Sequence, residues 1–359
     1  MWLTLTVLFL CIKKVIKTSK TCIPSLDHLI GGGLPAGAIF VVEEDLLGNY
    51  SRILTKYYLA EGIVCNHALF IASADDDPQE ILKELPQPCT SPPDSEITKI
   101  TENMDKMKIA WRYEGLSQVE SSFGNNTCFG HHFDLSKHID VDKIKNNDIS
   151  YCYVDFTESN VEGFRNCLYS NLLLRIKEII KDYENSKSKD KNILRICIQS
   201  LGSPIWMSID CEEASLDHYG QDLIKFMYCL RILLRDKNAT AFVTVPSHLF
   251  EDEHLMKRVL YSVDNSVKLE SFTGSSKETN PVYKDYHGLF HITKLSAVYC
   301  MVPYVPPSLD LAFKLKRKKF VIEKLHLPPE LQESSEREQD DITSTAYACG
   351  GFKKKDIDF

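Results

Sequence analysis

The sequence predicts an α/β fold with a largely parallel central sheet flanked by helices and with antiparallel edge strands. Short, continuous apolar runs recur along the chain, as in strands that are buried on both faces. Segments with apolar residues at helical spacing alternate with these runs, which predicts βαβ units and therefore parallel strands. Two late strand-like segments have an antiparallel character and are expected to close one side of the sheet.

The first βαβ unit follows a glycine-rich start. Residues 25–37, SLDHLIGGGLPAG, predict one helical turn that is broken by glycines and a proline. Residues 38–42 (AIFVV) and 68–73 (ALFIAS) are apolar runs typical of buried strands. Between them, residues 50–62 have helical spacing, and Gly62 is predicted to be the C-cap of this helix.

The remaining elements continue the alternation. The long helical segments carry apolar residues on one face, and the strand segments are short and rich in apolar residues. Strands are predicted at 149–156, 193–198 and 239–245, helices at 163–183 and 216–234, and the antiparallel strands at 267–270 and 287–295.

Composition divides the 359 residues into one main domain and two terminal segments. Residues 1–20 form an atypical N-terminal segment, and residues 21–330 form the domain. Polar, proline-rich or aperiodic composition predicts mobile loops near 86–106 and 115–147. Residues 331–359, which include ESSEREQDDITSTA, are predicted to be a disordered tail.

The N-terminal run from Trp2 to Ile12 is similar to the apolar region of a signal peptide, which leaves a membrane-tethered or secreted protein as one alternative. No basic residue precedes the run, however, and no clear cleavage site follows it. It is also much shorter than the roughly 20 residues of a membrane helix. An extra strand or an atypical start of the chain is the favoured interpretation, and no membrane partner is expected.

Cysteine usage and charge exclude several classes of protein. The twelve cysteines are scattered without a C-x-x-C pair, which favours reduced thiols in the cytosol or nucleus and predicts no metal site. His287 and His291 are four positions apart, a separation of roughly 13 Å along a strand, so they do not predict a zinc pair. The net charge of −8 argues against a nucleic-acid binder that is basic over its whole surface.

A nucleotide loop is expected directly after the first core strand of such a fold. Gly32 and Gly37 have the glycine spacing of a phosphate loop, but they precede that strand and lack the following lysine. The residues that do follow the strand contain no lysine and three carboxylates, which would repel phosphate. This vestigial nucleotide loop comprises Glu43, Glu44, Asp45, Gly48, Asn49, Tyr50 and Ser51.

The acidic residue that holds magnesium in nucleotide hydrolases is also replaced. Gln199 stands at the expected strand end, and the alternative carboxylate, Asp155, is more readily explained as a helix cap or turn residue. No catalytic residue is therefore predicted. The competing hypothesis is a stand-alone ATPase with an atypical phosphate loop, in which Ser51 and Asp155 would serve magnesium.

A basic run, KLKRKK, lies between Phe313 and Phe320. It has two interpretations: a solvated amphipathic face, or a surface that binds the phosphates of RNA. The candidate RNA-binding residues are Lys314, Lys316, Arg317, Lys318 and Lys319.

Several motifs in a fixed order resemble the Elongator complex protein 4 family. They are SLDHLIGGGLPAG, VVEEDLLGNYSRILTKYYLAEG, KIAWRYEG, NILRICIQSLGSP, ESFTGSSKETNPVYKDYHGLFHI and LAFKLKRKKFVIEKLHLPPE. The resemblance covers residues 21–359, and the first stretch is also similar to the RecA and KaiC group. Residues 1–20 depart from the family, whose members usually begin with a polar arm.

The resemblance implies a RecA-like fold within a hetero-hexameric ring that also contains the fifth and sixth Elongator subunits. It further implies contact with the catalytic Elongator subunits, binding of tRNA, and a part in carboxymethyl-type modification of the wobble uridine. The subunit itself is then non-catalytic and carries no firmly bound cofactor, although ATP could act at a ring interface. The expected location is the cytoplasm and nucleus.

Overall fold

A computed structural model describes residues 18–21, 23–89, 130–153, 163–185, 192–207, 216–295 and 304–326. The apolar run Trp2–Ile12, Asp155 and the predicted tail lie outside the described residues. Within those ranges, no helix is both long enough and apolar enough to cross a membrane.

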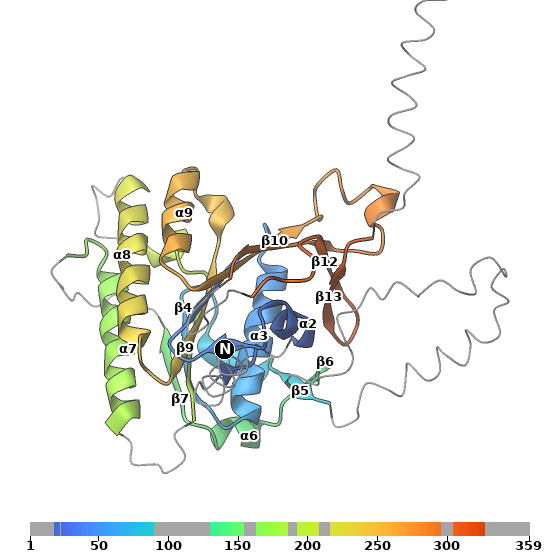
Figure 1. The fold of residues 1–359 in the computed structure, drawn as a ribbon. Helices are drawn as coiled ribbons and strands as arrows, with labels where there is room; N and C mark the ends of the chain where they lie inside the picture. Colours follow the sequence, from blue (N-terminus) through green and yellow to red (C-terminus); the bar gives the residue numbers. More distant parts are fainter. Residues whose placement is uncertain are drawn as a thin grey trace, which may run out of the picture.

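The central sheet has nine strands in the order β13-β12-β11-β10-β3-β9-β8-β4-β7 (Figure 1). The strands from β10 to β7 in this order pair in parallel, whereas β11, β12 and β13 pair antiparallel. The predicted α/β class, with a mostly parallel sheet and antiparallel edge strands, is confirmed, and the arrangement is consistent with a RecA-like fold. The parallel strands are β3 (Ile39–Glu43), β4 (Ala68–Ser73), β7 (Ile149–Tyr153), β8 (Leu194–Ile198), β9 (Ala239–Val245) and β10 (Asn265–Ser271). The antiparallel strands are β11 (Gly288–Lys294), β12 (Leu311–Leu315) and β13 (Phe320–Lys324). The strand predicted at 267–270 as antiparallel lies in β10, which pairs antiparallel with β11 but parallel with β3, so that prediction is only half right.

Helices cover both faces of the sheet and create two apolar cores. On one face, α2 (Pro24–Leu29) and α3 (Asn49–Val64) pack with the β11–β13 end of the sheet. On the other face lie α7 (Cys167–Asn185), α8 (Leu216–Leu234) and α9 (Glu253–Tyr261) (Figure 1). Strands β3, β8 and β9 are buried along their whole length, which explains why they read as continuous apolar runs.

Regular structure also occupies parts of the segments expected to be loops. Strand β5 (Pro86–Pro88) pairs antiparallel with β6 (Phe133–His138), and α6 (Val141–Lys145) follows β6. These short elements lack the periodicity that would reveal them in a sequence. The small remaining elements are β1 (Thr18–Ser19), which pairs with β2 (Leu34–Pro35), α4 (Pro78–Lys83), and 3-10 turns at Pro204–Trp206, Ser247–Leu249 and Pro281–Tyr283.

The predicted C-cap at Gly62 is wrong, because α3 continues to Val64 and Cys65 is its C-cap residue. Gly62 has another role, the close approach of α3 to the sheet. A Cβ atom at this position would lie 2.4 Å from Leu69 Cδ2 and 3.1 Å from Arg195 Cδ. Glycine at this site therefore reflects packing against β4 and β8 and not the end of the helix.

Candidate functional site: a nucleotide loop closed by its own carboxylate

The vestigial nucleotide loop lies at the carboxyl ends of the parallel strands. Residues 43–51 run from the last residue of β3 into the first turn of α3, and β3 lies between β9 and β10 near the middle of the sheet. The ends of β4, β8 and β9 reach the same edge of the sheet. This edge is where open α/β sheets bind their ligands.

Asp45 occupies the N-terminus of α3 with its own side chain. Its Oδ1 accepts hydrogen bonds from the backbone N–H groups of Tyr50 (3.1 Å) and Ser51 (3.2 Å), and its Oδ2 accepts one from Asn49 (3.1 Å). The turn is completed by Gly48, whose φ of 67° is left-handed and whose N–H donates to the Asp45 carbonyl. The first turn of α3 is therefore already bound to an anion.

The Asp45 carboxylate makes the contacts that a phosphate would make at a helix N-terminus. A helix N-terminus binds phosphate because unpaired N–H groups and the helix dipole both favour negative charge. The Asp45 side chain makes the same interactions and is almost fully buried, with 1% of its surface exposed. A nucleotide phosphate would have to displace a covalently attached competitor of the same charge.

The two glutamates before Asp45 are buried as well, and they face different partners. Glu43 Oε1 accepts a hydrogen bond from Thr293 (3.4 Å). Glu44 Oε1 accepts one from Ser200 (3.0 Å). Burial raises the pKa of Glu44 above its usual value, and the negative charges of Asp75 and Asp45 act in the same direction against hydrogen bonds that lower it. The loop thus adds acidity where a nucleotide would need positive charge.

The residues that the ATPase hypothesis requires have other partners. The Ser51 hydroxyl donates to the Gly48 carbonyl (3.0 Å) and is buried. Gln199 directly follows β8, as predicted, and its side-chain amide donates to Asp76 Oδ2 (2.7 Å). Asp76 also pairs with Arg52 of α3 at 3.3 Å. Asp155 lies outside the described residues.

Tyr50 connects the loop to the antiparallel end of the sheet. Its ring lies 4.8 Å from that of Phe313 in β12 and 6.5 Å from that of Phe320 in β13. The two phenylalanine rings stack on each other at 5.3 Å. Because these rings flank the basic run in the sequence, the loop and the basic run are held by one aromatic cluster.

The basic run forms the turn of the β12–β13 hairpin. Lys316 and Lys319 exchange backbone hydrogen bonds across the turn, and the side chains from Lys316 to Lys319 are exposed. Lys314 differs from them, because it pairs with Glu323 and lies over the ring of Tyr286. The four turn residues are thus displayed to solvent, whereas Lys314 is bound within the sheet.

The two histidines that are four positions apart, His287 and His291, have separate hydrogen-bond partners. His287 Nδ1 accepts a hydrogen bond from the Leu315 backbone, whereas His291 Nε2 contacts Glu270 Oε2 at 2.8 Å. Three other potential ligands do come together, Glu61, Cys65 and His131, at the opposite end of α3 from Asp45. Sequence spacing did not reveal them, because His131 follows Glu61 by 70 positions.

Comparison with known proteins identifies the family to which the motifs point. The PAXNEB protein family matches residues 15–359. Elongator complex protein 4 of Danio rerio is 41% identical over 331 residues, covering 88% of this chain and 82% of the relative. The protein of the same name from Homo sapiens is 40% identical, with 95% and 85% covered, and that from Schizosaccharomyces pombe is 26% identical, with 85% and 83% covered. The chain therefore belongs to the PAXNEB family, as a member of the Elongator complex protein 4 group.

Proposed function

We propose that this chain is a non-catalytic subunit of Elongator that forms a RecA-like hetero-hexameric ring with the fifth and sixth Elongator subunits. In this proposal residues 21–330 supply the RecA-like domain, and the ring binds tRNA and supports carboxymethyl-type modification of the wobble uridine in the cytoplasm and nucleus. The observation that carries the non-catalytic role is the closure of α3 by Asp45.

The closed loop argues against a stand-alone ATPase. Binding of a triphosphate needs free N–H groups and a cation, and here Asp45 takes the N–H groups while Glu43 and Glu44 add buried carboxylates. Any action of ATP in the assembly then takes place at an interface to which another subunit supplies the phosphate-binding groups.

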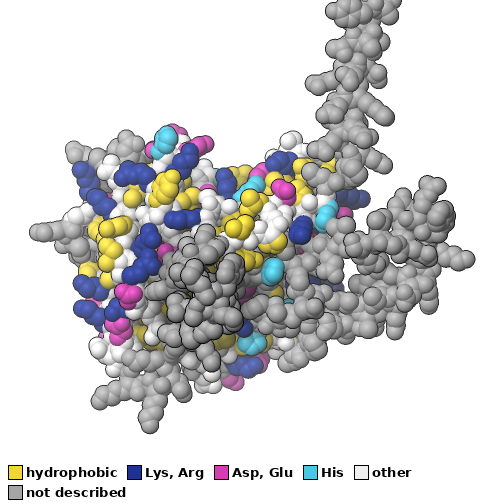
Figure 2. All heavy atoms as spheres, in the orientation of Figure 1, with side chains coloured by type: hydrophobic (Ala, Val, Ile, Leu, Met, Phe, Trp, Pro, Cys, Tyr) yellow, Lys and Arg dark blue, Asp and Glu magenta, His cyan; other side chains and the backbone are white. Residues whose placement is uncertain are grey.

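The tip of the loop supports a role in contacting protein. Leu46 and Leu47 stand side by side with 64% and 56% of their surfaces exposed. Exposed apolar side chains at a ligand-binding edge are typical of surfaces that a partner covers. Other exposed apolar residues, Tyr228, Ile232 and Tyr261, lie on the α8–α9 side, where Figure 2 shows lysine and arginine side chains beside apolar ones. We assign the Leu46–Leu47 tip to a subunit contact of the ring.

Co-expression with the fifth and sixth Elongator subunits tests the ring. Native mass spectrometry should detect a six-membered assembly with the wild-type chain, and Leu46→Asp combined with Leu47→Asp should reduce its yield at least tenfold. Leu174→Asp on α7, where the leucine is 40% exposed, is the matched control and should assemble normally. A wild-type chain that is folded yet stays monomeric in this mixture would refute the ring.

The β12–β13 turn is proposed to bind the tRNA backbone. The backbone N–H of Leu135 in β6 donates to the Lys318 carbonyl at 2.9 Å, so β6, with its exposed Lys137, lies beside the turn. Hydrogen bonds from Ser136 lower the pKa of Asp134, and the charges of Lys318 and Lys137 act in the same direction. The positive surface of the turn therefore extends from the hairpin to β6. Phosphate contacts of this kind give affinity that falls with salt concentration.

Alanine at Lys316, Arg317, Lys318 and Lys319 tests this surface in the assembled ring. We expect weaker tRNA binding and a salt slope, log K against log salt, that is shallower by roughly 0.7–0.9 for each lost phosphate contact. The control removes four exposed charges elsewhere, at Lys177, Lys181, Lys257 and Arg258. Equal affinities and slopes for both variants would return the turn to an ordinary solvated surface.

A further inference from the structure

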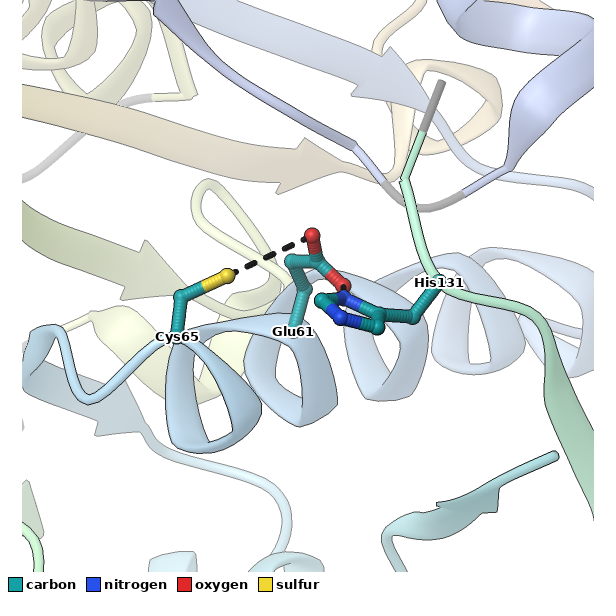
Figure 3. Close-up of side chains that lie close together, drawn as sticks. All are labelled: Glu61, Cys65 and His131. Atoms are coloured by element: carbon teal, nitrogen blue, oxygen red, sulfur yellow. Dashed lines mark hydrogen bonds and ion pairs between the residues drawn. The ribbon is translucent and has the colours of Figure 1, made fainter. Parts of the chain in front are cut away.

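Three side chains of different chemistry converge at the carboxyl end of α3. Glu61 and Cys65 are four positions apart on the helix, so they project from the same side, and His131 approaches from the segment that leads into β6 (Figure 3). One ligand atom from each residue lies within 4.8 Å of the other two. The His131 Nδ1–Glu61 Oε2 distance is 2.8 Å and the Cys65 Sγ–Glu61 Oε1 distance is 3.5 Å.

The donor set matches the chemistry of zinc. Zinc binds thiolate, imidazole and carboxylate at about 2.0–2.3 Å, which places the donor atoms of a tetrahedral site roughly 3.3–3.8 Å apart. The Cys65 Sγ–Glu61 Oε1 distance lies in that range. His131 Nδ1 contacts the other carboxylate oxygen, Oε2, so the His131 side chain has to shift to bring all three ligand atoms, which lie within 4.8 Å of one another, to the spacing of one ion. The His131 side chain is 51% exposed and free of core packing on one side, so it can make this shift.

We propose that Glu61, Cys65 and His131 form a zinc site, with water as the fourth ligand. The proposal is independent of the ring and of tRNA binding. Magnesium and calcium prefer sites built from oxygen ligands alone, so the thiol and the imidazole select a softer ion. The 1% exposure of the Glu61 side chain places one ligand inside the protein, and the exposed His131 leaves a path for the ion to enter.

The charges around the cluster are compatible with this ion. Burial raises the pKa of Cys65 to about 11, with a further contribution from Glu61, so the metal-free protein holds a neutral thiol at neutral pH. Arg195 and Lys20 act in the opposite direction and favour the thiolate. A zinc ion bound to one thiolate and one carboxylate would be neutral overall. Binding therefore requires Cys65 to release its proton, which makes affinity fall with decreasing pH.

A metal at this position would tie two parts of the chain that are distant in the sequence. His131 lies two residues before β6, and the backbone N–H of Leu135 in β6 donates to the Lys318 carbonyl of the hairpin turn at 2.9 Å. Zinc would thus fix the start of this segment to α3 and, through β6, steady the β12–β13 turn. In this role the ligands would join α3 to the segment that leads into β6.

Cobalt substitution of the purified full-length chain tests the site. After chelation and dialysis, Co²⁺ should bind with one equivalent per chain and give the near-ultraviolet band of a thiolate–cobalt bond. Binding of Co²⁺ should itself release about one proton as Cys65 ionises, and zinc should then displace the cobalt with no further proton release. Cys65→Ser should abolish the band, and His131→Ala should weaken binding by at least the roughly 10–100-fold that loss of an outer-shell partner costs.

Two matched variants separate this site from incidental binding. Cys89→Ser removes an exposed thiol elsewhere, and His132→Ala removes the neighbouring imidazole, so both should keep the band and the stoichiometry. A wild-type chain without a thiolate–cobalt band, or a band that persists in Cys65→Ser, would overturn the proposal. Magnesium in place of cobalt or zinc should show no competition.

A measurement on the wild-type chain covers the case in which a variant fails to fold. Zinc should protect Cys65 from alkylation by iodoacetamide and leave Cys89 reactive, as followed by peptide mass spectrometry at a pH high enough for the thiol to react. Equal modification of Cys65 with zinc and with chelator would reject the site without any substitution.

Discussion

The two ends of α3 bring their polar groups together in different ways. At the N-terminus, the free N–H groups meet the carboxylate of Asp45, which comes from the loop immediately before the helix. At the C-terminal end, Glu61 and Cys65 meet His131 from a segment 70 positions beyond Glu61. The N-terminal end is capped by a side chain from the adjacent loop, whereas at the C-terminal end side chains from two distant parts of the chain come together.

Under the proposed function, this difference explains how a RecA-like fold can keep its shape without a bound nucleotide. A nucleotide loop normally leaves the helix N-terminus unsatisfied until phosphate binds. Asp45 removes that dependence, because its side chain caps α3 without a ligand. The helix is then free to serve as a fixed support between the sheet, which it approaches at Gly62, and the segment that carries His131.

The largest expected effect comes from removing the carboxylate that closes the N-terminal end. Asp45→Ala leaves three N–H groups without a partner, and we expect it to lower the free energy of unfolding by about 2–3 kcal/mol, measured with urea. Asp45→Asn keeps an acceptor but not the charge, so its loss should be smaller. Because the N–H groups become available, inorganic phosphate should raise the melting temperature of Asp45→Ala and leave the wild type unchanged.

Asp252→Ala is the matched control for this prediction. Asp252 caps α9 by accepting one hydrogen bond, from the His254 N–H at 2.8 Å, and this bond is exposed. Its removal should cost about 0.5–1 kcal/mol. An Asp45→Ala variant that is no less stable than Asp252→Ala would mean that the loop, and not the carboxylate, holds the start of α3.

Local pattern was sufficient for much of this structure. Strands β4 and β9 and helix α8 were predicted with the boundaries that the structure shows, because each is long or continuously apolar. The position of residues 43–51 between the first buried strand and the next helix could be predicted for the same reason. That these residues form a vestigial nucleotide loop stays a prediction. The acidity of this loop is visible in the sequence. Which of its three carboxylates caps α3 is not, because Glu43, Glu44 and Asp45 are adjacent and only the structure shows that their side chains have different partners.

Contacts between segments that are distant in the sequence could not be predicted from local pattern. Gly62 reads as a helix end, and only the approach of Leu69 and Arg195 explains it. The pairing of β5 with β6 joins segments on either side of a long intervening stretch, so no local period marks it. The cluster of Glu61, Cys65 and His131 could not be predicted for the same reason. The i, i+4 spacing of Glu61 and Cys65 is ordinary in a helix, and His131 is remote in the sequence.

A smaller effect is expected at Glu44, which tests whether the N-terminal end depends on Asp45 alone. Because burial raises the pKa of Glu44 above 4.5 in the folded protein, its contribution to stability is complete below about 4.5 and is lost as pH rises through the folded pKa. Glu44→Gln keeps the acceptor for Ser200 and carries no charge. It should therefore be more stable than the wild type at neutral pH, by at most about 1 kcal/mol.

The pH dependence gives this prediction its sign. The stability difference between Glu44→Gln and the wild type should be small at pH 4.5, increase with pH through the folded pKa of Glu44, and then level off; urea unfolding across this range measures it. Glu253→Gln, at a glutamate whose side chain is 85% exposed, should show no such increase. If Glu44→Gln is instead less stable at neutral pH, the Glu44 carboxylate helps to hold the loop. The N-terminal end of α3 would then rest, like its other end, on several groups acting together.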